Sequence, residues 1–177
     1  MTLTFCPLCA GPLQYRQLED ERYPQPVCTQ GGHVVWQNPK PTVSALVLRH
    51  HDQDGVLEVL LVQRARPPWE GPWDCPGGFI DPEEHPTDAL RRELLEELSI
   101  DATIGELVGI YMDRYGEGGE STLNLYYRGV IRTGTPTPGS DVSAAAWFAL
   151  DALPHPLAFD NNRHALEALR VLLNDQK

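Results

Sequence analysis

The segment from Gly78 to Ile100 constrains this chain more than any other, because it sets a glycine, an arginine and several glutamates at fixed spacings. The charged residues at these fixed spacings are Glu84, Arg92, Glu93, Glu96 and Glu97. A solvated acidic helix face is the ordinary explanation of such a run. The fixed spacing of all these residue types together favours a site that binds cations instead.

Helix-forming residues fill the second half of this segment. The sequence predicts a helix over 87–98, with Pro86 in the first turn, where its missing N–H is not needed. Leucines recur at four-residue steps and form one buried stripe: Leu90, Leu94 and Leu98.

Three glutamates of this helix are three and four residues apart, so we expect them on a shared face: Glu93, Glu96 and Glu97. Like charges placed in this way repel, and an offsetting cation would relieve the repulsion. Carboxylate oxygens with water completing the shell suit Mg²⁺ or Mn²⁺. Pro76, Gly77 and Gly78 precede the helix as a turn where the backbone can approach a ligand closely.

This pattern resembles the Nudix box, G-x5-E-x7-R-E-U-x-E-E-x-G-U, in which U is a bulky apolar residue. The match runs from Gly78 through Leu94 to Ile100, with Ser99 in place of the last glycine. That glycine would end the helix in the left-handed conformation, so serine should cost about 1 kcal/mol there. The resemblance implies an α/β/α sandwich with a mixed sheet between helices. It also implies hydrolysis of a nucleoside diphosphate linked to another group.

The resemblance also assigns roles to single residues. Glu93, Glu96 and Glu97 would be metal ligands, together with the carbonyl of Gly77. Arg92 and Glu84 would orient these ligands through charge-assisted contacts. The family often supplies a further glutamate from a later loop as base or ligand, and Glu120 is the first candidate here, ahead of Glu117.

Substrate contacts are expected from residues before and after this segment. Arg64 and Arg66 are the side chains best suited to phosphate oxygens, with surface ion pairs as the alternative. A purine needs a flat stacking surface, and Tyr115 on the glycine-rich loop 115–120 is the preferred candidate. Trp73 and Phe159 are interpreted as core residues, although Trp73 could instead face a base and Phe159 could line the nucleotide pocket.

Residues 1–38 form a second unit, predicted from the pair Cys6 and Cys9 followed by Cys28. This unit resembles the zinc ribbon that precedes the hydrolase domain in the NADH pyrophosphatase branch of the family. Gly31 stands where a fourth cysteine is expected, and His33 could replace it in a structural Zn²⁺ site. A ribbon without metal, or a disulfide or chance pair, are the alternatives. Without metal, the unit would need to pack against the main domain or a second subunit, which leaves a homodimer open.

The remaining residues, 39–177, are expected to form the hydrolase domain. Strands are predicted over 41–48, 56–63, 107–113, 121–132 and 144–150, and an amphipathic helix over 162–174. Asp160 or Asn161 would cap that helix.

Charge and hydropathy exclude several classes of function. The chain has 177 residues and a formal net charge of −11 without a cluster of basic residues, so a broad nucleic-acid-binding face is not expected. No apolar stretch approaches ~18 residues, so we expect no membrane span. The first residues lack the basic and apolar regions of a secretory signal, and the cysteine usage favours the cytoplasm.

The sequence therefore predicts a Mg²⁺-dependent pyrophosphohydrolase with a small nucleotide substrate. ADP-ribose or an NADH-like dinucleotide is favoured as the substrate, because the N-terminal unit resembles the ribbon of that branch. ADP-ribose leads, because the Ser-Gln-Pro-Trp-Pro-Phe-Pro-x-Ser signature of the NADH branch is absent. Diadenosine polyphosphates or damaged nucleoside triphosphates are the alternative substrates. A non-catalytic nucleotide-sensing module is the alternative of another class.

Overall fold

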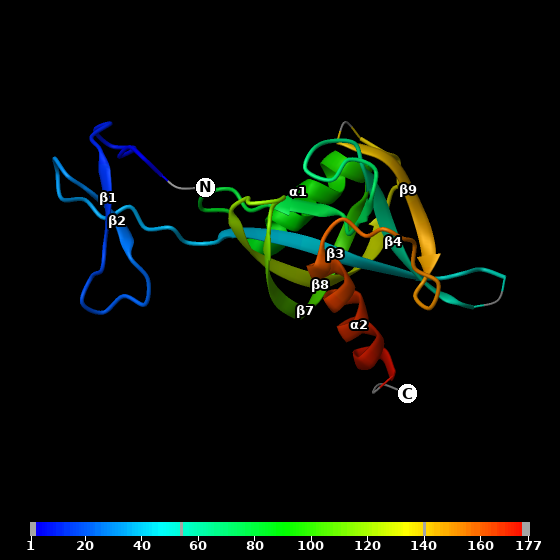
Figure 1. The fold of residues 1–177 in the computed structure, drawn as a ribbon. Coiled ribbons are helices and arrows are strands. Elements are labelled where there is room, and N and C mark those ends of the chain that lie inside the picture. Colours follow the sequence, from blue (N-terminus) through cyan, green and yellow to red (C-terminus); the bar gives the residue numbers. More distant parts are fainter. Residues whose placement is uncertain (1–2, 54, 140, 175–177) are drawn as a thin grey trace.

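A mixed β-sheet forms the centre of the computed structural model, which describes residues 3–53, 55–139 and 141–174 (Figure 1). The main path runs in the order β5-β4-β3-β8-β7, while β6 pairs with β3 and β9 pairs with β4. β3 and β8 are parallel, and the other pairs are antiparallel. The strands are β3 (Lys40–His50), β4 (Leu57–Arg64), β5 (Trp73–Asp74), β6 (Gly77–Phe79), β7 (Asp101–Arg114), β8 (Ser121–Thr133) and β9 (Val142–Ala149).

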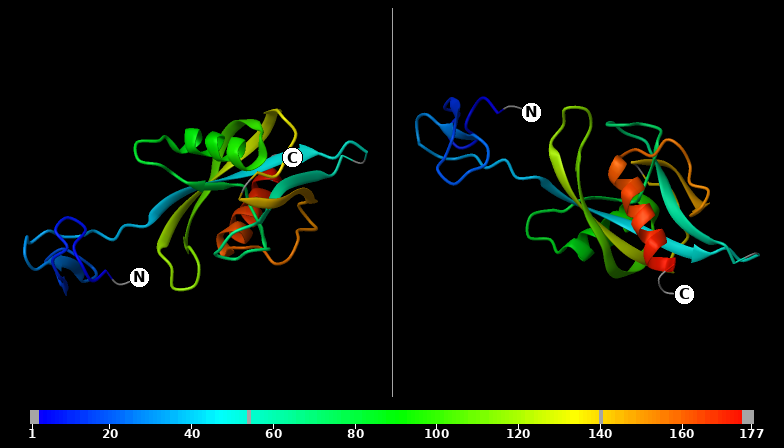
Figure 2. Two further views of the ribbon diagram at one scale, coloured as in Figure 1. Left: turned by 90° about the horizontal axis from the view of Figure 1, so that it is seen from above. Right: turned by 60° about the horizontal axis from the view of Figure 1, so that its bottom comes forward.

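One helix covers each face of this sheet, so the predicted α/β/α sandwich is confirmed (Figures 1 and 2). α1 (Pro86–Leu98) and α2 (Asp160–Asn174) take opposite faces. The alternation of β3 explains the arrangement, because successive side chains of a strand point to opposite faces. Val43, Ala45 and Val47 pack in the cluster under α1. Leu46 and Leu48 pack in the cluster under α2.

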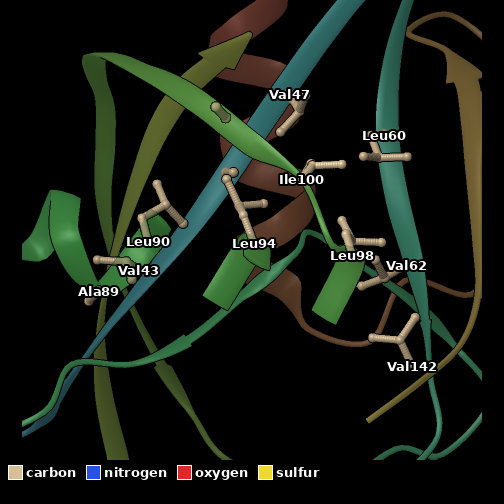
Figure 3. Close-up of a cluster of buried hydrophobic side chains, with 12 residues drawn as sticks. Val43, Val47, Leu60, Val62, Ala89, Leu90, Leu94, Leu98, Ile100 and Val142 are labelled. Carbon is tan, nitrogen blue, oxygen red and sulfur yellow. The ribbon is translucent and has the colours of Figure 1, made fainter. Parts of the chain in front are cut away.

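The leucine stripe of α1 is buried as predicted. Leu90, Leu94 and Leu98 are fully buried in one cluster with Val43 of β3 and Val62 of β4, and Leu98 lies beside Val62 (Figure 3). Burying each leucine side chain contributes about 1.5–3 kcal/mol, which holds α1 in one orientation. The acidic positions of the helix are therefore held relative to the turn before it.

Three parts of the main domain differ from the predicted elements. β7 begins at Asp101, six residues before the predicted start, because its first residues pair with the end of β8 at Thr133. The short strands β5 and β6 fall in the glycine- and proline-rich segment that was interpreted as a loop and a turn. α2 begins at Asp160, so Asp160 and Asn161 lie in its first turn and do not precede it as caps.

The N-terminal unit is a separate two-stranded sheet of β1 (Leu13–Arg16) and β2 (Gln25–Cys28). Figures 1 and 2 show it to one side of the main sheet, joined by the stretch that leads into β3. Several of the large apolar side chains of this unit and its connection are exposed: Phe5, Leu8, Tyr23 and Trp36. Among the described residues, no helix is long and apolar enough to cross a membrane.

Candidate active site

A cavity of about 400 Å³ opens where the turn before α1 meets β3, β4 and the start of α2. This volume lies within the usual range for small-molecule sites. Its wall combines carboxylates, arginines and aromatic rings, including Arg64, Arg66, Asp74, Gly77, Glu93, Arg92, Glu97, Tyr115, Phe159 and Asn161. Most of the predicted site residues therefore meet at one place, although they come from distant parts of the chain.

α1 directs two of its three predicted metal ligands into the cavity. The helix starts after His85, whose ring accepts a hydrogen bond from the backbone N–H of Thr87. Glu93 and Glu97 are one helical turn apart and both line the cavity. The side chain of Glu96 is 60% exposed and does not line it. The expected common face of the three glutamates is thus only partly realised.

Glu97 is the most unusual carboxylate of the site. Its Oε2 accepts a hydrogen bond of 3.0 Å from the backbone N–H of Gly77, and burial raises its pKa to about 8. Gly77 has φ +148°, and a Cβ there would collide with the carbonyl oxygen of Val43. Glycine is therefore required at 77 to bring this N–H against Glu97.

Arg92 connects the other carboxylates. Its guanidinium donates to Glu84 at 3.0 and 2.9 Å, to Glu93 at 2.8 Å and to the carbonyl oxygen of Phe79 at 3.0 Å. Arg92 lowers the pKa of Glu84 through these bonds. Burial raises the pKa of Glu93, and Arg92 opposes that shift. Arg92 thus ties the turn to the helix and holds Glu93 at the edge of the cavity.

The donor set fits a divalent cation with oxygen ligands. In the described part of the chain, no lysine or arginine forms an ion pair with Glu97, although its carboxylate is buried and close enough to Glu93 for their charges to interact. A buried carboxylate without a cationic partner is costly unless it is protonated or binds a metal ion. Glu93, Glu97 and the carbonyl of Gly77 offer the hard oxygen atoms that Mg²⁺ and Mn²⁺ prefer.

Ser99 ends α1 in the conformation expected of a glycine. Its φ of 55° and ψ of 34° are left-handed, and its N–H bonds to the carbonyl of Leu95 at 3.0 Å. The bond from Ser99 to Leu95 is that of the αL motif, and the next N–H, of Ile100, bonds to the carbonyl of Leu94 at 3.4 Å. Serine therefore keeps the geometry of the turn and carries a conformational cost.

Arg64 is held by protein groups at the cavity wall. It donates to Asp74 at 3.0 Å and to the carbonyl of Pro68 at 2.9 Å, and it lies 5.2 Å from the centre of the Phe159 ring. Arg66 is more exposed and pairs with Asp141 at 2.9 Å. Both arginines line the cavity, and their contact with phosphate stays a prediction.

The aromatic part of the wall contains Phe159 as well as Tyr115. The two rings stack with centroids 5.9 Å apart and an interplanar angle of 17°. Phe79 meets Tyr115 edge-on at 5.2 Å. Phe159 thus lines the cavity, which was the less favoured of its two sequence interpretations. Trp73 packs in the core against Phe148, as expected.

Glu120 is not brought to the carboxylates. It pairs with Lys40 at the start of β3, its side chain is 56% exposed, and it does not line the cavity. Glu117 is also exposed and outside the lining. The loop that carries both residues places Glu120 beside Lys40, which sequence reasoning did not associate with it. The structure therefore gives no support to either residue as base or ligand.

Sequence reasoning missed a set of buried polar residues in this region. Asn162 donates to Asp74 at 2.8 Å and accepts from the hydroxyl of Tyr126 at 2.7 Å. Asn161 and Asp74 also line the cavity. A signal was present for Asn162, because it lies three, four and seven residues before the buried Ala165, Leu166 and Leu169.

Three cysteines meet in the N-terminal unit. The sulfur atoms of Cys6, Cys9 and Cys28 all lie within 4.8 Å of one another, and all three thiols are free. The backbone N–H of Gly31 donates to the sulfur of Cys28 at 3.4 Å, and such bonds lower the pKa of that thiol to about 7. His33 lies outside the group, and its ring covers Gly31. The fourth cysteine, Cys75, belongs to the main domain and not to this group, and burial raises the pKa of its thiol.

Comparison with known proteins identifies the fold and the box together. The family model described as the NUDIX domain matches residues 38–169. The chain belongs to the Nudix family. It is a Nudix hydrolase, and its relatives include proteins named as pyrophosphatases. Nudix enzymes act on small nucleotide substrates and generally use Mg²⁺ or Mn²⁺.

Individual relatives cover different parts of the chain. An ADP-ribose pyrophosphatase of Methanocaldococcus jannaschii is 28% identical over 66% of this chain and 71% of its own length. A CTP pyrophosphohydrolase of Escherichia coli is 47% identical over 32% of this chain and 42% of that enzyme.

Solved structures agree on the fold. A Nudix hydrolase from Nitrosomonas europaea has a TM-score of 0.76 at 26% identity and covers 93% of this chain and 88% of its own. The Nudix domain of NrtR from Shewanella oneidensis, solved with ADP ribose, has a TM-score of 0.67 at 30% identity, covering 78% and 90% of the two chains.

Proposed function

We propose that this Nudix pyrophosphohydrolase hydrolyses the pyrophosphate bond of ADP-ribose to AMP and ribose 5-phosphate. Two similarities support this substrate: the archaeal relative named as an ADP-ribose pyrophosphatase, and the NrtR domain solved with ADP ribose. The cavity supports it as well, because one wall carries carboxylates and another carries stacked aromatic rings next to an arginine. A molecule with a diphosphate at its centre and a base at one end matches this division.

The acidic wall of the cavity would hold the metal. Glu93, Glu97 and the carbonyl of Gly77 would hold Mg²⁺ or Mn²⁺ in the cavity, and Glu96, which lies outside the lining, would add a ligand from the exposed side of the helix. When bound, the cation would offset the charge of the diphosphate and lower the pKa of water near it. Arg92 and Glu84 keep Glu93 in place, and the N–H of Gly77 orients Glu97.

The opposite wall would bind the rest of the substrate. Arg64 and Arg66 present guanidinium groups to the cavity, where phosphate oxygens can accept bidentate hydrogen bonds. Asp74 fixes the direction of the Arg64 side chain, so little conformational entropy is lost when phosphate binds. The rings of Tyr115 and Phe159 offer a surface on which a base can stack.

The buried carboxylate of Glu97 carries the proposal, since a chain without a metal-dependent reaction has no need of a buried carboxylate without a cationic partner in this cavity. The test is turnover of ADP-ribose, NADH, diadenosine tetraphosphate and CTP in parallel, each with Mg²⁺. We expect the highest kcat/KM with ADP-ribose and equal amounts of AMP and ribose 5-phosphate. A higher kcat/KM with any of the other three substrates would overturn the assignment.

A nucleoside triphosphate is the second candidate substrate, because the Escherichia coli CTP pyrophosphohydrolase is the more identical relative over its shorter match. CTP in the same panel tests it directly. A nucleotide-sensing module without catalysis is disfavoured by the presence of all four box carboxylates: Glu84, Glu93, Glu96 and Glu97. Tight binding of ADP-ribose without turnover would favour the sensor.

We further propose that residues 1–38 form a unit separate from the hydrolase domain of residues 39–177 and hold a structural Zn²⁺. Three thiols within 4.8 Å of one another suit a tetrahedral ion. The N–H of Gly31 stabilises the thiolate form of Cys28, as a metal site requires. The fourth ligand would be His33 after rotation of its ring, or water.

A further inference from the structure

Asn161 is a polar residue of the cavity that lacks a partner for its side-chain oxygen. It is the second residue of α2, it is only 4% exposed, and it lines the cavity. Its Oδ1 is the one buried side-chain nitrogen or oxygen without a hydrogen bond among the described residues. A buried acceptor without a donor destabilises the folded protein, so its retention points to a ligand.

The neighbouring Asn162 shows that a missing hydrogen-bond partner is not general among the polar side chains here. Both side-chain atoms of Asn162 are engaged, the oxygen by Tyr126 at 2.7 Å and the nitrogen by Asp74 at 2.8 Å. The backbone N–H of Asn161 is also satisfied, by Asp113 at 3.2 Å. The first turn of α2 is thus fixed in place, and of these groups only the side-chain oxygen of Asn161 lacks a hydrogen-bond donor.

The surroundings of Asn161 are those of a nucleobase site. Phe159, two residues earlier, stacks on Tyr115 and lies beside the guanidinium of Arg64. All four residues line the same cavity as the carboxylates. Because Tyr115 and Phe159 already touch each other, a base would lie against an outer ring face and not between the two rings.

We infer that Asn161 selects the base of the substrate by accepting a hydrogen bond from the 6-amino group of adenine. The inference rests on the proposed function and adds to it the residue that recognises the base. The unpaired atom is an acceptor, so its partner must be a donor, and the exocyclic amino group is the donor on the adenine base. An asparagine amide matches the adjacent donor and acceptor of adenine, so its nitrogen can bond to the neighbouring ring nitrogen.

The test compares ADP-ribose with IDP-ribose, which carries hypoxanthine and so replaces the 6-amino group by an oxygen. We expect the wild type to prefer ADP-ribose in kcat/KM, mainly through KM. Asn161→Ala should lower kcat/KM for ADP-ribose roughly ten- to hundredfold and change IDP-ribose little, so the preference disappears. Asn161→Asp keeps an acceptor oxygen and should retain part of the preference. Equal preference in the wild type and Asn161→Ala would overturn the inference.

A binding measurement separates this inference from the proposed reaction. Calorimetry on the Glu97→Gln variant without metal gives the Kd of ADP-ribose and IDP-ribose independently of turnover. A wild type that hydrolyses both with equal kcat/KM contradicts base selection and leaves the hydrolysis of nucleoside diphosphate riboses intact. If the wild type neither hydrolyses nor binds ADP-ribose, both the base selection and the proposed reaction are contradicted. Asn162→Ala is the matched control, and it should lower the melting temperature without changing the ratio of the two substrates. If Asn161→Ala does not fold, Asn161→Asp and the wild-type preference still decide the question.

Discussion

The backbone N–H of Gly77 lies 3.0 Å from Oε2 of Glu97, and this bond joins the turn before α1 to the end of that helix. The two residues are twenty positions apart, and neither could hold its place alone. Gly77 needs a positive φ to approach, and Glu97 needs the buried leucine stripe of α1 to face the cavity. The geometry of the acidic site therefore depends on the packing of the helix.

Substitution of Glu97 by glutamine should abolish most of the activity and leave the fold intact. Glutamine keeps the shape of the side chain and can still accept from Gly77, but it carries no charge for a cation. We expect kcat to fall by at least ~100-fold, a loss of roughly 3 kcal/mol of transition-state stabilisation. Glu167→Gln on the exposed part of α2 is the control and should behave as wild type. Near wild-type turnover of Glu97→Gln would show that the catalytic charge lies elsewhere.

The same residue predicts how stability without metal depends on pH. The pKa of Glu97 is raised from 4.5 to about 8 by burial, so between these values the folded state binds more protons than the unfolded state. The free energy of unfolding in EDTA should therefore fall as pH rises from about 5 to about 8, by up to about 1.4 kcal/mol per pH unit from this group. Denaturant unfolding at several pH values measures it.

Glu97→Gln provides the comparison for this prediction. The variant lacks the titrating carboxyl, so its stability without metal should exceed that of the wild type at pH 8 and match it more closely near pH 5. Adding Mg²⁺ at pH 8 should stabilise the wild type more than the variant. Parallel pH profiles of the two proteins would contradict a buried, uncompensated Glu97.

The sequence was sufficient for α1 because that helix depends on local periodicity, and the sandwich was implied by the resemblance to the Nudix family. The four-residue leucine repeat and the alternation in β3 each determine a buried face, and the structure buries both. The start of β7 was missed because Asp101 to Glu106 carries only two apolar side chains, Ala102 and Ile104, and its strand conformation depends on pairing with β8. Propensity is a weak guide where tertiary pairing decides.

The cavity was only partly predictable for a related reason. Glu93 and Glu97 follow from the spacing of the helix, whereas the pairing of Glu120 with Lys40 depends on β3 lying beside β8. Asn161 was interpreted as a helix cap, because the sequence alone does not show which cavity the first turn of a helix faces. Long-range contacts therefore account for most of the errors.

Substitution of Ser99 by glycine should stabilise the protein. Ser99 has φ 55°, a conformation that costs a residue with a Cβ about 1 kcal/mol relative to glycine. The melting temperature of Ser99→Gly should rise accordingly, with kcat unchanged because the turn keeps its hydrogen bonds to Leu94 and Leu95. Ser99→Ala keeps the Cβ and should give no gain. A lower melting temperature for Ser99→Gly would show that the serine side chain contributes a compensating interaction.

Removal of one thiol of the N-terminal unit should abolish zinc binding without changing catalysis. The purified protein should contain about one Zn²⁺ per chain, and Cys9→Ser should lose it, because the two remaining thiols bind the ion far more weakly than three. Cys75→Ser, in the main domain, is the control and should keep its zinc. The His33→Ala variant tests the fourth ligand. With Co²⁺ in place of Zn²⁺, its absorption spectrum differs from that of the wild type if His33 coordinates the ion and stays the same if water does. Because Cys9 does not line the cavity, Cys9→Ser should retain the kcat of the wild type, and a wild type without zinc would contradict the proposed site.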